Sequence, residues 1–369
     1  MNDVEDLKEF AYIHARAQRI FNYKTVVSRI DNDGPGGPGS WVHEWRTVGQ
    51  ALEKRGRLMD ACRHYNMARF PHVDGPARQE ALDLCVDAFT RWRDEKRPGI
   101  ERIDLDLPTG RVSCWAEGLS ATDPKPLLLI MGGITSIKEQ WAQGLVLPRR
   151  LGMAGLAIEL PGVGQNTMPY GADSWTMLPA LLDEVSGRAK VDETYALAYS
   201  FSGHMVLQCA RKDPRIRGLV TASAPISDFF ADREWQRQVP RLTKETLAHL
   251  MGVPVDGLAD GLSGWGLADA ELAGLDIPVY SLASLREEII PSGDVARLRA
   301  HVRRLELLVN DDQHASPRHV LESKLWTALS IMNMAGIHGP QRALISVLLR
   351  VLRARHRPVP ASSTAAGQN

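Results

Sequence analysis

A serine near the middle of the chain stands between an apolar run and a helix-like segment. The run Thr194–Ala198 is mostly small and apolar, as expected for a buried strand, and Ser200 follows it closely. From Gly203 onward, apolar residues recur at helical spacing. A hydroxyl on a sharp strand-to-helix turn is exposed and can act as a nucleophile when a base lies within reach. Ser200 is therefore a candidate nucleophile, and an ordinary strand–helix junction is the alternative.

A glycine-rich stretch offers the backbone groups that such a nucleophile needs. The sequence Met131-Gly-Gly-Ile-Thr-Ser-Ile-Lys-Glu139 comes directly after the apolar run 127–130. Its glycines allow backbone N–H groups to approach a substrate oxygen closely. If Ser200 is the nucleophile, the N–H groups of Ile134 and Phe201 are the expected oxyanion donors. A glycine-rich turn without a ligand is the competing interpretation.

One of the eleven histidines is placed where a general base would be needed. His314 lies in the polar stretch 311–317, which follows the last apolar run of the chain, 305–309. This position predicts a loop at the carboxyl edge of a sheet, where an imidazole would meet Ser200. Helix packing or surface exposure explains the other histidines more simply, among them His64, His72, His204, His301 and His319.

Composition limits the class of protein. With 369 residues and 44% hydrophobic content, the chain can bury a large core and one smaller domain. The 44 Lys and Arg residues balance 44 Asp and Glu residues, which predicts no general attraction to nucleic acid or to an anionic membrane. The four cysteines are scattered and suggest neither disulfides nor a zinc site. No secretory signal or membrane span is visible, so a cytoplasmic protein is expected, and a homodimer is left open.

Two kinds of pattern divide the chain. Residues 1–100 show charged and aromatic residues at helical spacing and form an expected helical unit. Alternating residues at 103–107 and 111–115 predict a hairpin. Continuous apolar runs then predict strands that are covered on both faces, as in a mostly parallel α/β sheet. These runs are Pro126–Met131, Gly155–Leu160, Thr194–Ala198, Gly218–Ala222, Pro278–Ala283 and Leu305–Val309.

These patterns predict a cap, a core with an insertion, and a tail. Residues 1–100 are expected to form an N-terminal helical cap, and residues 101–357 an α/β core. A charged segment with helical spacing, 228–275, predicts a helical insertion that belongs to the cap. The composition of the tail, 358–369, predicts disorder.

Together these motifs resemble one family of α/β-hydrolases. Its members include bacterial 2,6-dihydroxypseudooxynicotine hydrolase, fungal polyketide-shortening pigment hydrolases and fermentation-respiration switch-like proteins. The resemblance rests on Trp41–Gly49, Gly56–Ala61, Tyr65–Pro71, Gly132-Gly133 with Lys138-Glu139, Pro161–Gly164 and the regions of Ser200, Glu287 and His314. It implies an α/β-hydrolase fold with a helical cap, and a serine nucleophile, an acid and a histidine in that chain order.

The resemblance selects the acid of the triad. Hydrolases of this topology commonly carry it four positions before the proline of the loop 284–291, which points to Glu287, with Glu288, Asp228 and Asp294 as the other candidates. Family members often have Asp at the position of Glu287 and at that of Thr135. The turn around Ser200 also differs, because Ala198 and Ser202 replace the glycines of the usual Gly-x-Ser-x-Gly signature.

The expected function is hydrolysis of an acyl bond by a Ser200–His314–Glu287 triad, without metal or cofactor. The resemblance implies ester, thioester or carbon–carbon bonds beside a carbonyl. A large cap predicts a bulky, polyketide-like or aromatic small molecule as substrate. Expected substrate contacts are Asp228, Thr135, Tyr65, Phe70 and Trp141. Two alternatives remain: an acyltransferase or cyclase on the same fold, and an inactive ligand-binding relative.

Overall fold

A single twisted sheet forms the centre of the computed structural model, which describes residues 2–355. The tail 358–369, predicted to be disordered, lies outside the described residues. The strands run in the order β1-β2-β4-β3-β5-β6-β7-β8. Their bounds are β1 Ile100–Leu107, β2 Gly110–Glu117, β3 Pro126–Met131, β4 Ala154–Ile158, β5 Lys190–Ala198, β6 Ile216–Ala222, β7 Val279–Ser284 and β8 Leu305–Asn310.

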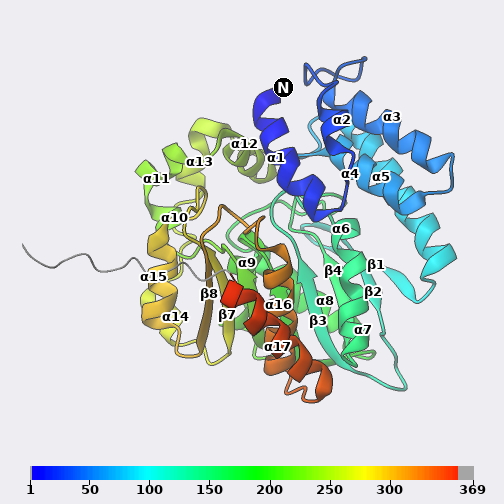
Figure 1. The fold of residues 1–369 in the computed structure, drawn as a ribbon. Helices are drawn as coiled ribbons and strands as arrows, with labels where there is room; N and C mark the ends of the chain where they lie inside the picture. The colour runs from blue at the N-terminus through cyan, green and yellow to red at the C-terminus, as the bar shows by residue number, and fades with distance from the viewer. Residues whose placement is uncertain (1, 356–369) are drawn as a thin grey trace, which may run out of the picture.

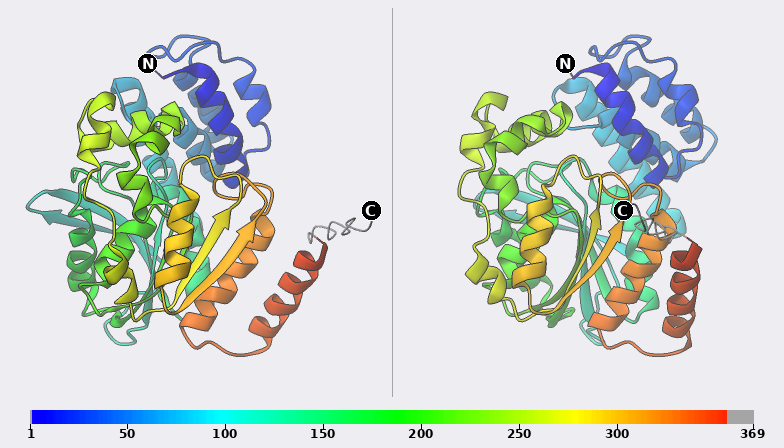
Figure 2. Two further views of the ribbon diagram at one scale, coloured as in Figure 1. Left: turned by 90° about the vertical axis from the view of Figure 1, so that its left-hand side faces the viewer. Right: turned by 60° about the vertical axis from the view of Figure 1, so that its left-hand side comes forward.

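The sheet is mostly parallel, which confirms the predicted α/β-hydrolase class of fold. β1 and β2 form the predicted hairpin, and β2 pairs antiparallel with β4. Every later pairing, from β3–β4 to β7–β8, is parallel. Strands such as β3 and β4 are buried almost throughout because helices cover both faces of the sheet (Figure 2). Because β3 to β8 run parallel, their carboxyl ends meet at one edge of the sheet.

Helices precede the sheet, connect its strands and follow it (Figure 1). The α-helices are α1 Val4–Ala17, α2 Tyr23–Val27, α3 Trp41–Glu53, α4 Leu58–Arg69, α5 Pro76–Lys96, α6 Lys138–Ala142, α7 Val146–Arg150, α8 Met177–Val185, α9 Phe201–Ala210, α10 Asp228–Ala231, α11 Arg233–Gln238, α12 Arg241–Met251, α13 Leu258–Gly261, α14 Asp269–Ala273, α15 Ser292–His301, α16 Val320–Met334 and α17 Pro340–Arg355. Short 3₁₀ turns are η1 Gln143–Leu145, η2 Ser174–Thr176 and η3 Val255–Gly257. No helix within residues 2–355 is long and apolar enough to cross a membrane.

The first five helices and α12 lie on the same side of the sheet (Figure 1). A buried apolar cluster connects them: Trp41 and Trp45 of α3 pack with Phe70, and Leu242 of α12 joins the same cluster. The indole Nε1 of Trp41 donates to the carbonyl of Met67, so the large ring is buried without an unpaired polar group. We call α1–α5 and α12, the helices that share this cluster, the cap helices.

Helix α1 has one face that packs against other helices and one that points toward a cavity. Its start is fixed by Asp3, whose carboxylate accepts hydrogen bonds from the N–H groups of Glu5 and Asp6. Residues Leu7, Ala11 and Ala15 recur every four positions and are buried against the other cap helices. The neighbouring face of α1 points toward the carboxyl ends of the strands, where the cavity described below lies.

Candidate active site

Ser200 lies on a strained turn between β5 and α9. Its backbone has φ 57° and ψ −130°, a conformation that L-residues rarely adopt. The N–H of Ser200 donates to the carbonyl of Ala222 on the neighbouring strand, at 2.8 Å, which holds the turn in place. Gly203 allows α9 to begin close to the sheet, since a Cβ there would lie 2.1 Å from Oγ1 of Thr221. This is the geometry of a nucleophile elbow.

Glu287 and His314 form a closely hydrogen-bonded pair. Nδ1 of His314 lies 2.5 Å from Oε1 of Glu287. Because a carboxylate only accepts, Nδ1 carries the proton and Nε2 is left free to accept one. Ser223 donates to the other oxygen of Glu287 at 2.6 Å, and the N–H groups of Ile289 and Ile290 donate to Oε1. The carboxylate is therefore oriented by four donors.

The pair shifts both pKa values away from their ordinary positions. Burial alone raises the pKa of Glu287, but the charge and hydrogen bond of His314 and the Ser223 hydroxyl reverse this and lower it. Burial likewise lowers the pKa of His314, and the Glu287 carboxylate reverses that effect and raises it above 6.5. The imidazolium form of His314 is thus stabilised, as a general base in acyl transfer requires.

Ser200 and His314 line the same cavity, whose volume is about 630 Å³. Ile134 and Phe201, the expected oxyanion donors, line it as well. The loop that carries Ile134 passes directly beside the nucleophile, because a Cβ on Gly133 would lie 3.3 Å from Cβ of Ser200. A side chain there would crowd the serine, which explains the glycine. The structure therefore brings the predicted nucleophile, base and oxyanion residues to one place.

The other acid candidates have different partners. Oε2 of Glu288 accepts the backbone N–H of His314 at 3.0 Å, which supports the histidine loop and not its ring. Asp294 is buried and accepts four backbone N–H groups in the stretch 226–229. Asp228 pairs with Arg297 at 2.8 Å. Among the residues that the structure describes, Glu287 is the carboxylate that contacts the His314 ring.

Two of the five predicted substrate contacts lie on the cavity. Thr135 and Trp141 line it, whereas Tyr65, Phe70 and Asp228 do not. Tyr65 is fully buried and its hydroxyl donates to Glu53 at 2.5 Å. Phe70 packs between His14 and Trp41, with ring centroids at 4.6 and 6.2 Å. Asp228 is held by Arg297. The side chains of these three residues are engaged in packing or pairing and do not line the cavity.

Sequence reasoning missed the helix that forms a wall of the cavity. Phe10, Ile13, His14 and Ala17 of α1 line it, and so does Gln18, which directly follows the helix. Their spacing of three, four and one residues places them on one helical face, and this signal was visible in the sequence. Which face would meet the cavity depended on how α1 packs, which the pattern alone does not give.

His14 brings a second imidazole to the cavity. Burial lowers its pKa to about 3, and the nearby positive charges of Arg69 and His314 add to this effect. Nε2 of His14 lies 3.5 Å from Oγ1 of Thr135, the threonine of the glycine-rich loop. At neutral pH His14 is therefore uncharged, and it can donate or accept one hydrogen bond in the cavity.

Comparison with known proteins shows which family the chain resembles. Residues 31–288 match the family model described as "Esterase FrsA-like". Esterase FrsA of Vibrio cholerae serotype O1 is 24% identical over 249 residues, which cover 62% of this chain and 60% of the relative. The chain thus spans about 60% of the length of the curated relatives that it matches.

Two solved structures are also similar. The structure titled "AbyA5 Wildtype" is 46% identical and superposes with a TM-score of 0.92, covering 95% of this chain and 100% of that one. The 2,6-dihydroxy-pseudo-oxynicotine hydrolase is 19% identical, with a TM-score of 0.65 over 80% of this chain and 86% of its own; this likeness shows a shared fold. The family match over most of the chain, joined to the α/β-hydrolase sheet, shows that this chain belongs to the FrsA-like esterase family.

Proposed function

We propose that the protein is a serine hydrolase that cleaves an acyl bond in a bulky small molecule. One observation carries the proposal: a serine on a strained elbow and an imidazole that is paired with a carboxylate line one cavity. Homologues named esterase and hydrolase support the reaction class. Since the chain spans only part of those curated relatives, the activity of the whole protein is part of the proposal.

The reaction uses each group in one role. Nε2 of His314 takes the hydroxyl proton of Ser200 as Oγ attacks the substrate carbonyl, and Glu287 stabilises the imidazolium that forms. The N–H groups of Ile134 and Phe201 donate to the oxyanion. The imidazolium then protonates the leaving group as the carbon–heteroatom bond breaks. Water, deprotonated by the same histidine, releases the acyl group and regenerates Ser200.

The cavity indicates the size and polarity of the substrate. Its volume of about 630 Å³ suits a molecule much larger than an acetyl ester. Apolar residues from three directions line it: Phe10 and Ile13 of α1, Leu242 of α12 and Trp141 of α6. An ester or thioester with a bulky polyketide-like or aromatic acyl group fits these walls. Cleavage of a carbon–carbon bond beside a carbonyl is one version of the same chemistry.

Labelling with a serine-directed phosphonate tests the proposal. The reagent should modify Ser200, and peptide mass spectrometry locates the site. Ser202 is a matched control, because its hydroxyl is buried and donates to the carbonyl of Tyr199 at 2.8 Å. We expect Ser200→Ala to abolish the label and to lower turnover of a bulky aryl ester by on the order of 10⁴-fold or more. Labelling of Ser202, or active protein without any label, would disprove the assignment.

A further inference from the structure

A fully buried arginine reaches from the cap to the active-site loop. Arg69 is the last residue of α4, and only 2% of its surface is exposed. Its guanidinium donates to Oδ1 of Asn66, to the carbonyl of Pro71 and to the carbonyl of Thr135, the last at 2.6 Å. All of these acceptors are neutral. Within residues 2–355, no carboxylate lies within ion-pair distance of Arg69.

The second buried arginine of the same region is different. Arg78 of α5 forms ion pairs with Asp33 at 2.6 Å and with Asp74 at 2.8 Å, and it also donates to the carbonyl of Phe70. Its charge is compensated within the cap. Burying a charge without a paired carboxylate is costly, so Arg69 calls for an explanation that Arg78 does not. Burial lowers the pKa of Arg69 to about 10, although the more distant carboxylates of Glu159 and Glu139 act in the opposite direction, and the guanidinium remains charged at neutral pH.

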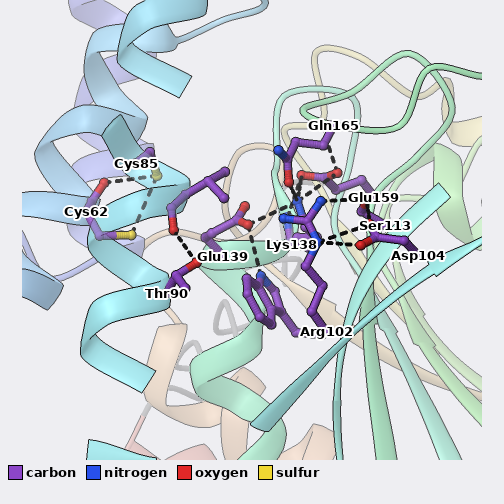
Figure 3. A network of polar contacts seen from close by, with 12 residues as sticks. Cys62, Cys85, Thr90, Arg102, Asp104, Ser113, Lys138, Glu139, Glu159 and Gln165 are labelled. Atoms are coloured by element: carbon purple, nitrogen blue, oxygen red, sulfur yellow. Dashed lines mark hydrogen bonds and ion pairs between the residues drawn. The ribbon is translucent and has the colours of Figure 1, made fainter. Parts of the chain in front are cut away.

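The carbonyl that Arg69 binds belongs to the loop Gly132–Ile137, which we call the oxyanion loop. Gly133 of this loop lies against Ser200, and Ile134 follows it. The core holds the other end of the loop, where the backbone N–H of Lys138 donates to Glu159 at 3.1 Å. Figure 3 shows Lys138 between Glu139 and Glu159. Its Nζ lies 3.0 Å from the carboxylate of Glu139 and 3.4 Å from that of Glu159.

The loop is therefore fixed at two points by buried charged residues. Lys138, Glu139 and Glu159 all belong to the core, since Lys138 and Glu139 begin α6 and Glu159 directly follows β4. Arg69 comes from the cap. A shift of about 1 Å in an oxyanion donor is enough to lose much of its effect, so the residues that fix the loop control the N–H of Ile134.

We propose that Arg69 is a positioning residue for catalysis: through the Thr135 carbonyl it holds the oxyanion loop against Ser200 and places a positive charge behind that loop. This inference rests on the proposed function. In this proposal the cap contributes to stabilising the transition state, in addition to forming a wall of the substrate cavity. The buried guanidinium stabilises negative charge that develops on the substrate oxygen, and this effect is absent in the ground state.

Arg69→Lys and Arg69→Met test the proposal against the matched variant Arg78→Lys. Lysine keeps the positive charge but cannot reach all three acceptors, and methionine removes both charge and donors. We expect Arg69→Lys to lower kcat on a bulky aryl ester by about 10- to 100-fold with KM changed less than about threefold. Arg69→Met should lose more. Arg78→Lys should lower the melting temperature and leave kcat within about twofold.

A second readout separates positioning from a merely structural role. A boronate that forms a tetrahedral adduct with the serine mimics the transition state, whereas the product acid mimics the ground state. Arg69→Lys should weaken boronate binding by about tenfold or more and leave product binding nearly unchanged. If Arg69→Met does not fold, as circular dichroism would show, Arg69→Lys decides alone.

Folded Arg69→Lys protein with wild-type kcat and boronate affinity would overturn the inference, and so would equal losses in boronate and product binding. Failure of the proposed function gives a different result, because wild-type protein would then not be labelled at Ser200. With Ser200 labelled and Arg69→Lys unchanged, only the inference about Arg69 fails.

Discussion

Two histidines face the same cavity and are shifted in opposite directions. His314 comes from a core loop and pairs with Glu287, which raises its pKa above 6.5. His14 comes from the cap, where burial and the charge of Arg69 lower its pKa to about 3. His314 on one wall can therefore accept a proton, whereas His14 on the other wall stays neutral. Their partners, and not their shared location, separate the two roles.

The supports of the two histidines differ in the same way. The loop of His314 is fixed by Asp312, a buried carboxylate that accepts the N–H groups of Gln313 and Arg318. His14 is held by the packing of α1 and by ring contact with Phe70. The core thus provides a densely hydrogen-bonded site, and the cap provides shape, neutral hydrogen-bonding groups and the buried charge of Arg69.

Replacing each histidine should give the largest contrast. We expect His314→Ala to lower kcat by on the order of 10⁴-fold or more, because no group then removes the Ser200 proton. His14→Ala should retain most of kcat. Steady-state kinetics on a bulky aryl ester measures both. Similar losses in the two variants would mean that both imidazoles take part in proton transfer, and the distinction between them would fail.

Removing the Glu287 carboxylate should change both the size of kcat and the pH dependence of kcat/KM. Glu287→Gln should lower kcat by on the order of 10³- to 10⁴-fold, since the imidazolium loses its partner. His314 must be neutral to act as a base, so the rate rises as the pH passes its pKa. Because Glu287 raises that pKa, the acidic limb of kcat/KM should move to lower pH in Glu287→Gln.

Glu288→Gln provides the control for this prediction. Glu288 accepts the backbone N–H of His314 and does not touch its ring. We expect a change of less than about threefold in kcat. The acidic limb should move to lower pH by less than in Glu287→Gln, because the charge of Glu288 contributes less than Glu287 to the raised pKa of His314. A larger effect for Glu288→Gln than for Glu287→Gln would show that Glu287 is not the triad acid.

Apart from the Glu288→Gln control, the smallest expected effect concerns His14. A hydrogen bond from a neutral imidazole contributes about 0.5–1.5 kcal/mol, so His14→Gln should change kcat/KM by about two- to tenfold. The effect should depend on the substrate and disappear for short acetyl esters that do not reach α1. An equal loss for long and short esters would show that His14 acts on the reacting carbonyl.

The sequence was sufficient to predict the strands and the loops that follow them, because the order of parallel strands along the chain determines where those loops lie. Short apolar runs predicted the parallel strands, and parallel strands bring their carboxyl ends together, so the loops of Ser200 and His314 were expected at one edge. The structure places both on one cavity. The hydrogen-bond partner of the histidine ring, Glu287, was selected by its place in a loop and by family resemblance.

The cap could not be predicted to the same depth. A helical pattern shows which residues share a face, but not which face meets the cavity. Tyr65 and Phe70 were expected at the substrate because they are aromatic, and both are buried among cap helices. Arg69 gave no signal, since an arginine at the end of a helix is usually solvated. Its contact with Thr135, 66 residues later, depends on how the cap packs on the core.

The rate of phosphonate labelling at Ser200, measured across pH, tests the central claim most directly. The reagent reports the nucleophile and its base together and does not depend on knowing the substrate. The account predicts labelling at Ser200 with a midpoint above pH 6.5, shifted downward in Glu287→Gln and unchanged in His14→Gln. Labelling elsewhere, or a midpoint at Ser200 that follows His14 and ignores Glu287, would contradict it.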